Sequence, residues 1–141
     1  MSSPAGYSGT PLPKKLGIKP GSRLALIDAP DGFELTLGEL PAGVGVRTTA
    51  RGTVDVTVAF FADRAKLERR FPAIRSALDP DGGLWIAWPK RASGVATDLT
   101  ENVVRELGLA AGLVDNKVCA IDEVWSGLRL VYRLADRPGG S

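Results

Sequence analysis

Residues 82–133 read GGLWIAWPKRASGVATDLTENVVRELGLAAGLVDNKVCAIDEVWSGLRLVYR, and this stretch says most about the fold. Its apolar and aromatic run 84–88 (LWIAW) is typical of a strand that is buried on both faces. A helix is predicted next, with Asp98 as its N-cap and Glu101 completing a capping box. Gly108, in the left-handed backbone conformation, is predicted to end this helix. Two further strands follow this helix, so the stretch predicts a strand, a helix and then a hairpin.

The predicted hairpin and the segment before 84–88 depend on short turns. Strands are predicted at 114–124 and 128–134, joined around Trp125 to Gly127, and so short a connection forces the two strands to be antiparallel. Residues 79–83 (DPDGG) predict a turn that leads into the buried run.

The chain before this stretch alternates between two kinds of segment. Strands are predicted at 23–28, around Val44 and Val46, and at 53–62, and helices at 11–16, 33–40 and 64–78. With the final hairpin, this alternation predicts a single three-layer α/β Rossmann-like domain, whose sheet is mostly parallel and ends in an antiparallel hairpin. The connection 48–52 is short for a parallel crossover, so the second strand is either very short or outside the parallel set.

Composition limits the class of protein. The 141 residues suit one domain, and a hydrophobic fraction of 44% and a charged fraction of 24% are ordinary for a globular protein. We predict a flexible N-terminus at 1–10, the Rossmann-like domain at 11–134 and a flexible tail at 135–141. The net charge of +2, the lack of a long apolar run and the lack of a signal-peptide pattern predict a cytoplasmic protein that binds neither nucleic acid nor membrane.

The absence of histidine removes several kinds of chemistry. Without it, the Ser-His-Asp and Cys-His arrangements of nucleophilic enzymes are excluded. A single cysteine, Cys119, adds almost nothing with which to coordinate zinc or iron, so no metal site is predicted. Any catalysis would use carboxylates, lysines, tyrosines or a cofactor, and the sequence identifies no catalytic residue.

Two resemblances follow from these patterns. A Rossmann-like sheet that ends in an antiparallel hairpin resembles the class I methyltransferases. KLGIKPGSRLALIDAP (15–30), LWIAWPKRASG (84–94) and DLTENVVRELGLAAGLVDNKVCAIDEVWSGLRLV (98–131) resemble an uncharacterised family of small bacterial proteins, catalogued as a domain of unknown function. That resemblance spans about 11–133 and implies this fold and a bacterial cytoplasmic setting, but no activity.

The methyltransferase resemblance implies a cofactor site that can be compared with the sequence. S-adenosylmethionine enzymes of this fold carry a glycine-rich loop after the first strand and an acidic residue at the end of the second. Here the loop 29–33 (APDGF) has one glycine and a proline, and the second strand ends in Arg47-Thr48-Thr49. These departures predict that the protein binds no cofactor, with S-adenosylmethionine as the disfavoured alternative.

Ligands of open α/β sheets bind beyond the carboxyl ends of the strands. The candidate ligand-binding residues at that edge are Asp28 and Asp31 after the first strand, and Trp88, Lys90 and Ser93 after the fourth. Lys90 near a helix N-terminus would attract an anion, and Trp88 would give an apolar wall. The competing interpretation, which the sequence favours, is that Lys90 pairs with Asp28 or Asp31 while Trp88 fills the core.

The leading functional prediction is a non-enzymatic binding or regulatory domain on a degenerate methyltransferase-like scaffold, with an unknown protein or small-molecule ligand as its partner. The alternative is a divergent S-adenosylmethionine-dependent methyltransferase or another small transferase that uses Lys90 and Asp28. The arginines of the helix predicted at 64–78 favour a solvated outer face over a nucleic-acid surface.

Overall fold

The computed structural model describes residues 10–136. The predicted flexible ends, 1–10 and 135–141, fall almost wholly outside this range. The helices are α1 (Leu12–Lys15), α2 (Phe33–Leu37), α3 (Arg64–Ser76) and α4 (Glu101–Ala110), the strands are β1 (Arg23–Ile27), β2 (Gly45–Arg47), β3 (Val54–Phe60), β4 (Leu78–Pro89), β5 (Leu113–Ala120) and β6 (Trp125–Tyr132), and the 3-10 helices are η1 (Arg91–Ser93) and η2 (Leu134–Asp136). No described helix has the length and apolar character needed to cross a bilayer.

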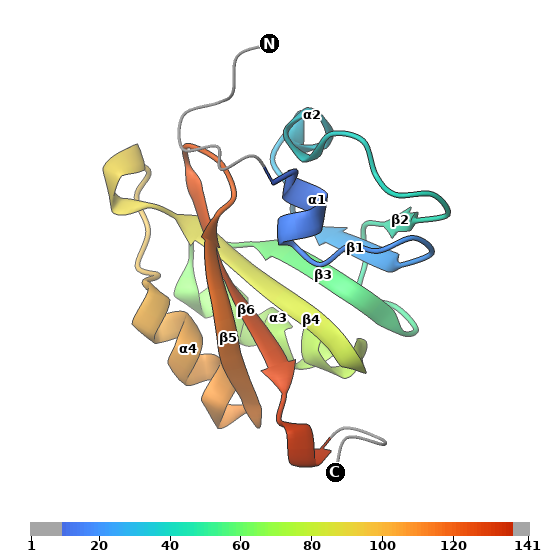
Figure 1. The fold of residues 1–141 in the computed structure, drawn as a ribbon. Coiled ribbons are helices and arrows are strands. Elements are labelled where there is room, and N and C mark those ends of the chain that lie inside the picture. The colour runs from blue at the N-terminus through green and yellow to red at the C-terminus, as the bar shows by residue number, and fades with distance from the viewer. Residues whose placement is uncertain (1–9, 137–141) are drawn as a thin grey trace.

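The six strands form one sheet in the order β2-β1-β3-β4-β6-β5 (Figure 1). The first four strands are parallel, and β6 runs antiparallel to both β4 and β5. Side chains of α1 and α2 pack on one face of the sheet and those of α3 and α4 on the other. The predicted three-layer Rossmann-like fold with an antiparallel C-terminal hairpin is therefore confirmed.

The short connection before β3 is explained by the length of β2. This strand has three residues, which pair only with the first three residues of β1. The chain leaving β2 therefore has little distance to return before β3 begins at Val54. Ala50, within the connection, packs against the core on the α3 face. Of the two alternatives left open by the sequence, the very short parallel strand is the one observed.

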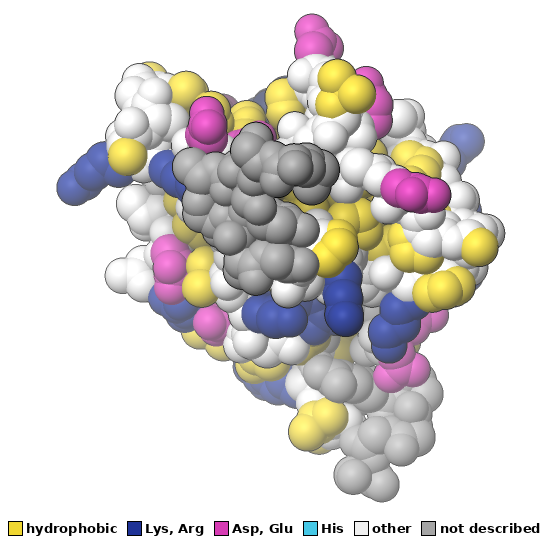
Figure 2. All heavy atoms as spheres, turned by 45° about the horizontal axis from the view of Figure 1, so that its top comes forward, with side chains coloured by type: hydrophobic (Ala, Val, Ile, Leu, Met, Phe, Trp, Pro, Cys, Tyr) yellow, Lys and Arg dark blue, Asp and Glu magenta, His cyan; other side chains and the backbone are white. Residues whose placement is uncertain are grey.

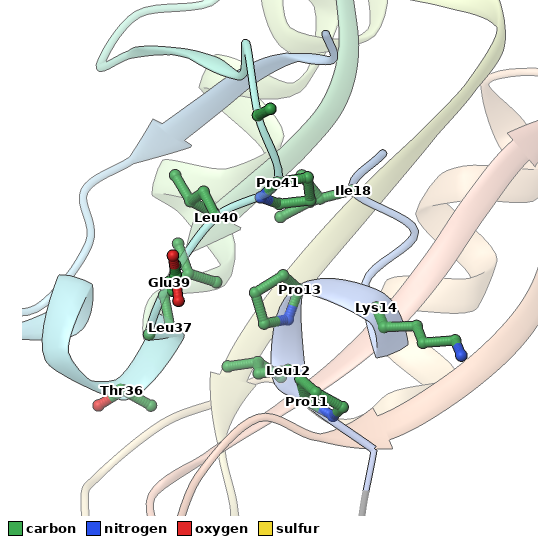
Figure 3. A pocket seen from close by; sticks show the side chains of 12 residues that line it. Pro11, Leu12, Pro13, Lys14, Ile18, Thr36, Leu37, Glu39, Leu40 and Pro41 are labelled. Atoms are coloured by element: carbon green, nitrogen blue, oxygen red, sulfur yellow. The ribbon is translucent and has the colours of Figure 1, made fainter. Parts of the chain in front are cut away.

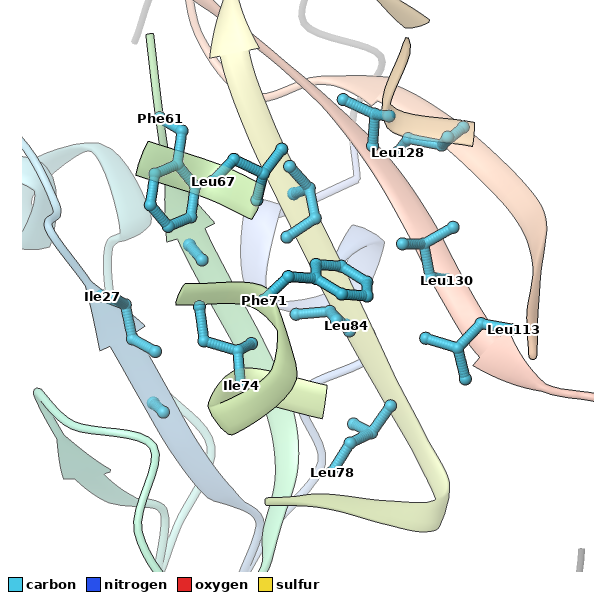
Figure 4. Close-up of a cluster of buried hydrophobic side chains, with 14 of the residues drawn as sticks. Ile27, Phe61, Leu67, Phe71, Ile74, Leu78, Leu84, Leu113, Leu128 and Leu130 are labelled. Atoms are coloured by element: carbon cyan, nitrogen blue, oxygen red, sulfur yellow. The ribbon is translucent and has the colours of Figure 1, made fainter. Parts of the chain in front are cut away.

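Each face of the sheet has its own apolar cluster. On one face, Leu67, Phe71 and Ile74 of α3 point at the strands, as their helical spacing predicts (Figure 4). On the other, the fully buried Trp85 of β4 donates its indole N–H to the carbonyl oxygen of Leu16 at 2.9 Å. A buried indole N–H without a partner is costly, so this bond fixes the segment after α1 to the sheet.

The helix α4 differs from its prediction at both ends. Its N-cap is Thr100, whose hydroxyl accepts a hydrogen bond from the backbone N–H of Val103 at 3.2 Å. Asp98 instead accepts from the backbone N–H of Arg64 at 2.7 Å, so it joins this loop to α3. Gly108 lies inside α4, where a Cβ would come within 2.7 Å of the Leu130 side chain. The left-handed glycine after the helix is Gly112. Close packing, and not a helix stop, requires glycine at 108.

The hairpin turn also lies earlier than predicted. Strand β5 ends at Ala120 and Trp125 already belongs to β6, so the chain turns through residues 121–124. The Asp122 carboxylate accepts hydrogen bonds from the backbone N–H groups of Val124 and Trp125, both at 2.8 Å. An aspartate side chain that binds the backbone two and three residues on is a turn-forming arrangement. The turn therefore depends on Asp122 and not on Gly127.

Residues 79–83, predicted as a turn, belong to β4, which bends sharply there. Leu78 pairs with Val54 and Gly83 pairs with Val56, so residues 79–82 lie opposite Asp55 alone. A Cβ on Gly82 would stand 2.4 Å from the carbonyl oxygen of Asp55. This close backbone approach makes glycine necessary at position 82.

We expect Gly82→Ala to lower the free energy of unfolding by about 1–3 kcal/mol, because the added methyl group overlaps a backbone atom that cannot move away easily. The matched control is Gly45→Ala, since a Cβ at Gly45 meets nothing within 4 Å and its φ is not left-handed. Urea denaturation of both variants measures the difference. Equal midpoints for the two variants would contradict the assigned role of Gly82.

A second prediction concerns the Asp55 carboxylate, which accepts from the backbone N–H, Nε and Nη2 of Arg23 at 2.7, 2.9 and 2.9 Å. The hydrogen bond from the Arg23 side chain holds the pKa of Asp55 below its usual range. Its stabilising effect is present above the unfolded pKa of about 3.9 and is lost as the pH falls through the lower folded value. Asp55→Asn should therefore be less stable than wild type at pH 7, with a gap that narrows below about pH 4 in denaturant titrations. A pH-independent gap would contradict this account.

Candidate functional site at the carboxyl edge of the sheet

The parallel strands β1, β3 and β4 end at the same edge of the sheet. From β1 the chain first moves outward to β2, and after β3 it moves to β4 in the other direction. The strand order therefore reverses between β1 and β3, and open α/β sheets bind ligands in the crevice beyond such a reversal. Topology alone directs attention to the loops that follow β1, β3 and β4.

The loop after β1 begins with Asp28, the one non-glycine residue with a left-handed backbone (φ 55°) in the described chain. Its Oδ2 lies 2.7 Å from Nη1 of Arg70 and 3.4 Å from Nζ of Lys66. The Asp28 side chain nevertheless remains 38% exposed. Left-handed aspartates cost some backbone energy and gather at functional sites. The two cations of α3 thus hold an accessible carboxylate at the point where the strand order reverses.

Sequence reasoning missed Lys66 and Arg70, although a signal was available. The two cations are four residues apart on α3, so they project from the same side of the helix. The competing interpretation in which Lys90 neutralises Asp28 or Asp31 is wrong, because Lys66 and Arg70 are the partners of Asp28. In the described residues, the side chain of Asp31 makes no hydrogen bond or ion pair.

A hollow of about 540 Å³, which we name the β4 hollow, lies beyond the carboxyl end of β4. Trp88 and Lys90, predicted as ligand-binding residues, both line it. Ser93 does not line it, and its hydroxyl donates to the carbonyl oxygen of Lys90 at 2.7 Å and accepts from the N–H of Val95 at 3.1 Å. The structure therefore separates the predicted site into a β1 loop with Asp28 and Asp31 and a hollow with Trp88 and Lys90.

The loop at 94–100 connects these two places. The Thr97 hydroxyl donates to the carbonyl oxygen of Ala62, after β3, at 2.7 Å and accepts from the N–H of Leu99 at 3.0 Å. Asp98 binds the first turn of α3, the helix that carries Lys66 and Arg70. The loop is therefore fixed over the end of β3, between the β1 loop and the β4 hollow. Neither role of this loop was predicted.

Charges of both signs are mixed on the visible part of this face. In Figure 2 the top of Figure 1 is turned forward, and outside the grey atoms Lys and Arg side chains are interspersed with Asp and Glu side chains. Several arginines of α3 are occupied within the protein: Arg64 pairs with Glu68, Arg70 pairs with Asp28, and Arg75 binds the carbonyl oxygen of Ala111. Within residues 10–136, no group of three or more acidic or cysteine side chains is arranged to hold a metal ion.

A second hollow, of about 800 Å³, lies between α1 and residues 36–42 (Figure 3). Leu12 and Pro13 on one side and Leu37, Leu40 and Pro41 on the other give it mostly apolar walls. Sequence reasoning predicted none of these residues as a binding site. The lining includes one lysine and one glutamate, Lys14 and Glu39, so its charges balance.

Solved structures with a similar fold are methyltransferases. The chain is similar to ribosomal protein L11 methylase from Lactobacillus delbrueckii subsp. bulgaricus (TM-score 0.60, 13% identity, covering 86% of this chain and 75% of that one). It is also similar to magnesium protoporphyrin IX methyltransferase from Synechocystis PCC 6803 with bound SAM (TM-score 0.58, 12% identity, 86% and 74%). A SAM-dependent methyltransferase from Aquifex aeolicus gives a TM-score of 0.58 at 15% identity, with 83% and 85% covered. The chain has the Rossmann-like methyltransferase fold.

These likenesses correct two predictions made from the sequence. The leading prediction of a non-enzymatic domain is wrong, because the structures of similar fold are methyltransferases, the class that was the alternative. The prediction that no cofactor binds is also contradicted, because the Synechocystis enzyme was solved with bound SAM and with bound SAH. No protein-family model and no curated protein matches the chain, so the resemblance to an uncharacterised bacterial family stays a prediction.

The position of the loop at 94–100 can be tested through Thr97. We expect Thr97→Val to reduce stability by about 1 kcal/mol and to speed hydrogen exchange at the Leu99 amide, because both hydrogen bonds of the hydroxyl are lost. Thr48→Val is the control, since the exposed Thr48 hydroxyl makes no hydrogen bond within the described residues. Unchanged exchange at Leu99 would show that Thr97 does not hold the loop.

Proposed function

We propose that this protein is a divergent S-adenosylmethionine-dependent methyltransferase, with the cofactor at the β1 loop and the methyl acceptor in the β4 hollow. The observation that carries the proposal is the pair of neighbouring places at one edge of a methyltransferase sheet. One place holds an accessible carboxylate at the reversal of strand order, and the other is a hollow that the loop at 94–100 links to it. A transferase needs two adjoining sites so that donor and acceptor meet in one geometry.

The chemistry of the β1 loop fits the polar groups of this cofactor. S-adenosylmethionine carries a positive sulfonium, an amino group and ribose hydroxyls, all of which are attracted to carboxylates. The β1 loop supplies two carboxylates, Asp28 and Asp31. The backbone at Gly32 is also open, because a Cβ there would meet nothing within 4 Å. In this site Asp28, whose charge Lys66 and Arg70 already balance, would accept a hydrogen bond from the cofactor, and Asp31 would serve the ribose.

The fit departs from the usual arrangement at β2. Arg47, at the end of that strand, donates from Nη1 to the carbonyl oxygen of Arg51 at 2.8 Å and offers no acceptor to a ribose. Both carboxylates of the proposed site therefore come from the β1 loop. When bound, the cofactor supplies a methyl group already activated by the sulfonium, so the protein has mainly to bind, orient and exclude water.

The proposal predicts that S-adenosylmethionine and S-adenosylhomocysteine raise the melting temperature of the wild-type protein by several degrees. A ligand at 100 times its Kd adds about 2.7 kcal/mol, which is a shift of this size for a domain of this length. Asp28→Asn should abolish most of the ligand-induced shift, because a neutral amide attracts the cofactor less. Thermal denaturation with and without each ligand gives the measurement.

The control for this experiment is Asp136→Asn, in the 3-10 helix η2 that follows the antiparallel strand β6. The η2 segment, close to the chain end marked C, lies at the other end of the molecule from α2 (Figure 1). The control variant should keep the full ligand-induced shift. If neither adenosyl compound shifts the wild-type protein, and calorimetric titration also detects no binding, the methyltransferase proposal is wrong.

A further inference from the structure

We infer that the β4 hollow takes a small molecule with an apolar body and an anionic oxygen group, a carboxylate or a phosphate. On the proposed function, which this inference deepens, that molecule is the methyl acceptor. The volume of about 540 Å³ lies within the roughly 300–1,000 Å³ that is usual for small-molecule sites. The class of ligand follows from the charges and surfaces that line the hollow.

The charged side chains of the β4 hollow are mainly positive. Lys90 and Arg91 line the hollow, and neither forms an ion pair with a carboxylate in the described part of the chain. Glu101 is the one acidic residue in the lining, and its carboxylate is paired with Arg105, which also binds Asp115, so the lining keeps an excess of positive charge. The hollow therefore presents two cations with no competing free carboxylate. Such a site favours an anion and repels a cationic ligand.

The apolar wall of the β4 hollow has a buried part and an exposed part. Trp88 and Leu99 line the hollow with only 7% and 3% of their surfaces exposed, so residues of the core form part of its wall. Val95, in contrast, is 45% exposed at the hollow and has apolar surface to cover. A ligand made only of charge would leave this surface in water. An apolar body attached to the anionic group would cover it.

The hydroxyl groups that line the β4 hollow differ in whether they already make hydrogen bonds. The hydroxyls of Thr97 and Thr100 already serve the backbone of the loop at 94–100 and of α4. Ser126 of β6 lies directly across from Trp88 in the sheet, and its hydroxyl makes no hydrogen bond within residues 10–136. The Ser126 hydroxyl is therefore available to donate to a ligand oxygen, from the same wall of the hollow as Trp88. A hydroxyl and two cations are complementary to an oxyanion.

The second hollow, between α1 and residues 36–42, offers a comparison within the same molecule. It is larger, but Lys14 and Glu39 give its lining one charge of each sign. Size and apolar walls alone would favour that hollow for a neutral ligand, whereas the unbalanced cations distinguish the β4 hollow. The preference for an anion is thus a property of one hollow and not of the protein surface in general.

The test uses phenyl phosphate and benzoate as anionic probes and benzyl alcohol as a neutral probe of similar size, added to the isotope-labelled full-length protein without any adenosyl compound. We expect both anions to cause saturable shifts in the amide NMR signals of Gly94, Val95 and Ser126. Binding should weaken as salt is added, because exposed charges are screened. Benzyl alcohol should bind at least tenfold more weakly.

The double variant Lys90→Gln/Arg91→Gln should weaken binding of both anions at least tenfold, with an otherwise unchanged spectrum that shows an intact fold. Arg69→Gln/Lys117→Gln removes the same charge from positions that line neither hollow and should leave binding unchanged. Equal binding of the neutral probe, shifts elsewhere in the spectrum, no shifts, or equal loss in both double variants would each overturn the inference. Anion binding without any response to adenosyl compounds would leave the ligand class standing and overturn the methyltransferase proposal alone.

Discussion

The fold depends on the double burial of β4. This strand is paired in parallel with β3 on one side and antiparallel with β6 on the other, so it joins the two halves of the sheet. Its residues from Gly82 to Pro89 are all buried, and alternate side chains enter the two apolar clusters. The Trp85 indole then fixes the α1 segment through Leu16. One strand thus organises both faces and both directions of pairing, and such a strand tolerates no change of register.

The same strand also places the β4 hollow. Because β4 and β6 are antiparallel, the carboxyl end of β4 meets the start of β6. The chain that leaves β4 is anchored there, because Lys90 donates its backbone N–H to the carbonyl oxygen of Val124 at 2.7 Å. Trp88 and Ser126 are strand partners, so two walls of the hollow are fixed by the sheet itself. A site built on paired strands holds its geometry better than one built on loops alone.

Local patterns predicted much of this architecture, and contacts distant in sequence account for the errors. The apolar run 84–88 and the apolar stripe of α3 report burial directly, so the second half of β4 and most of α3 were predicted, whereas residues 79–83 of β4 were wrongly predicted as a turn. Asp98 and Gly108 looked like helix caps because residue type alone suggests a cap. Their actual roles depend on Arg64 and Leu130, which are remote in sequence. The ion pairs of Asp28 with α3 were missed for the same reason, since they join residues about forty positions apart.

The wrong prediction that no cofactor binds relied on the missing acidic residue at the end of β2, and it is explained by the length of that strand. Arg47, its last residue, pairs with Ala25, and β1 continues for two more residues to Ile27. At about 3.3 Å per residue, β2 therefore ends roughly 7 Å short of the edge at which the β1 loop begins. A carboxylate at the end of so short a strand would not reach a ligand at that edge, so its absence says little about cofactor binding. In the proposed site Asp31 supplies the second carboxylate. Its side chain is exposed on the β1 loop and makes no hydrogen bond or ion pair within residues 10–136.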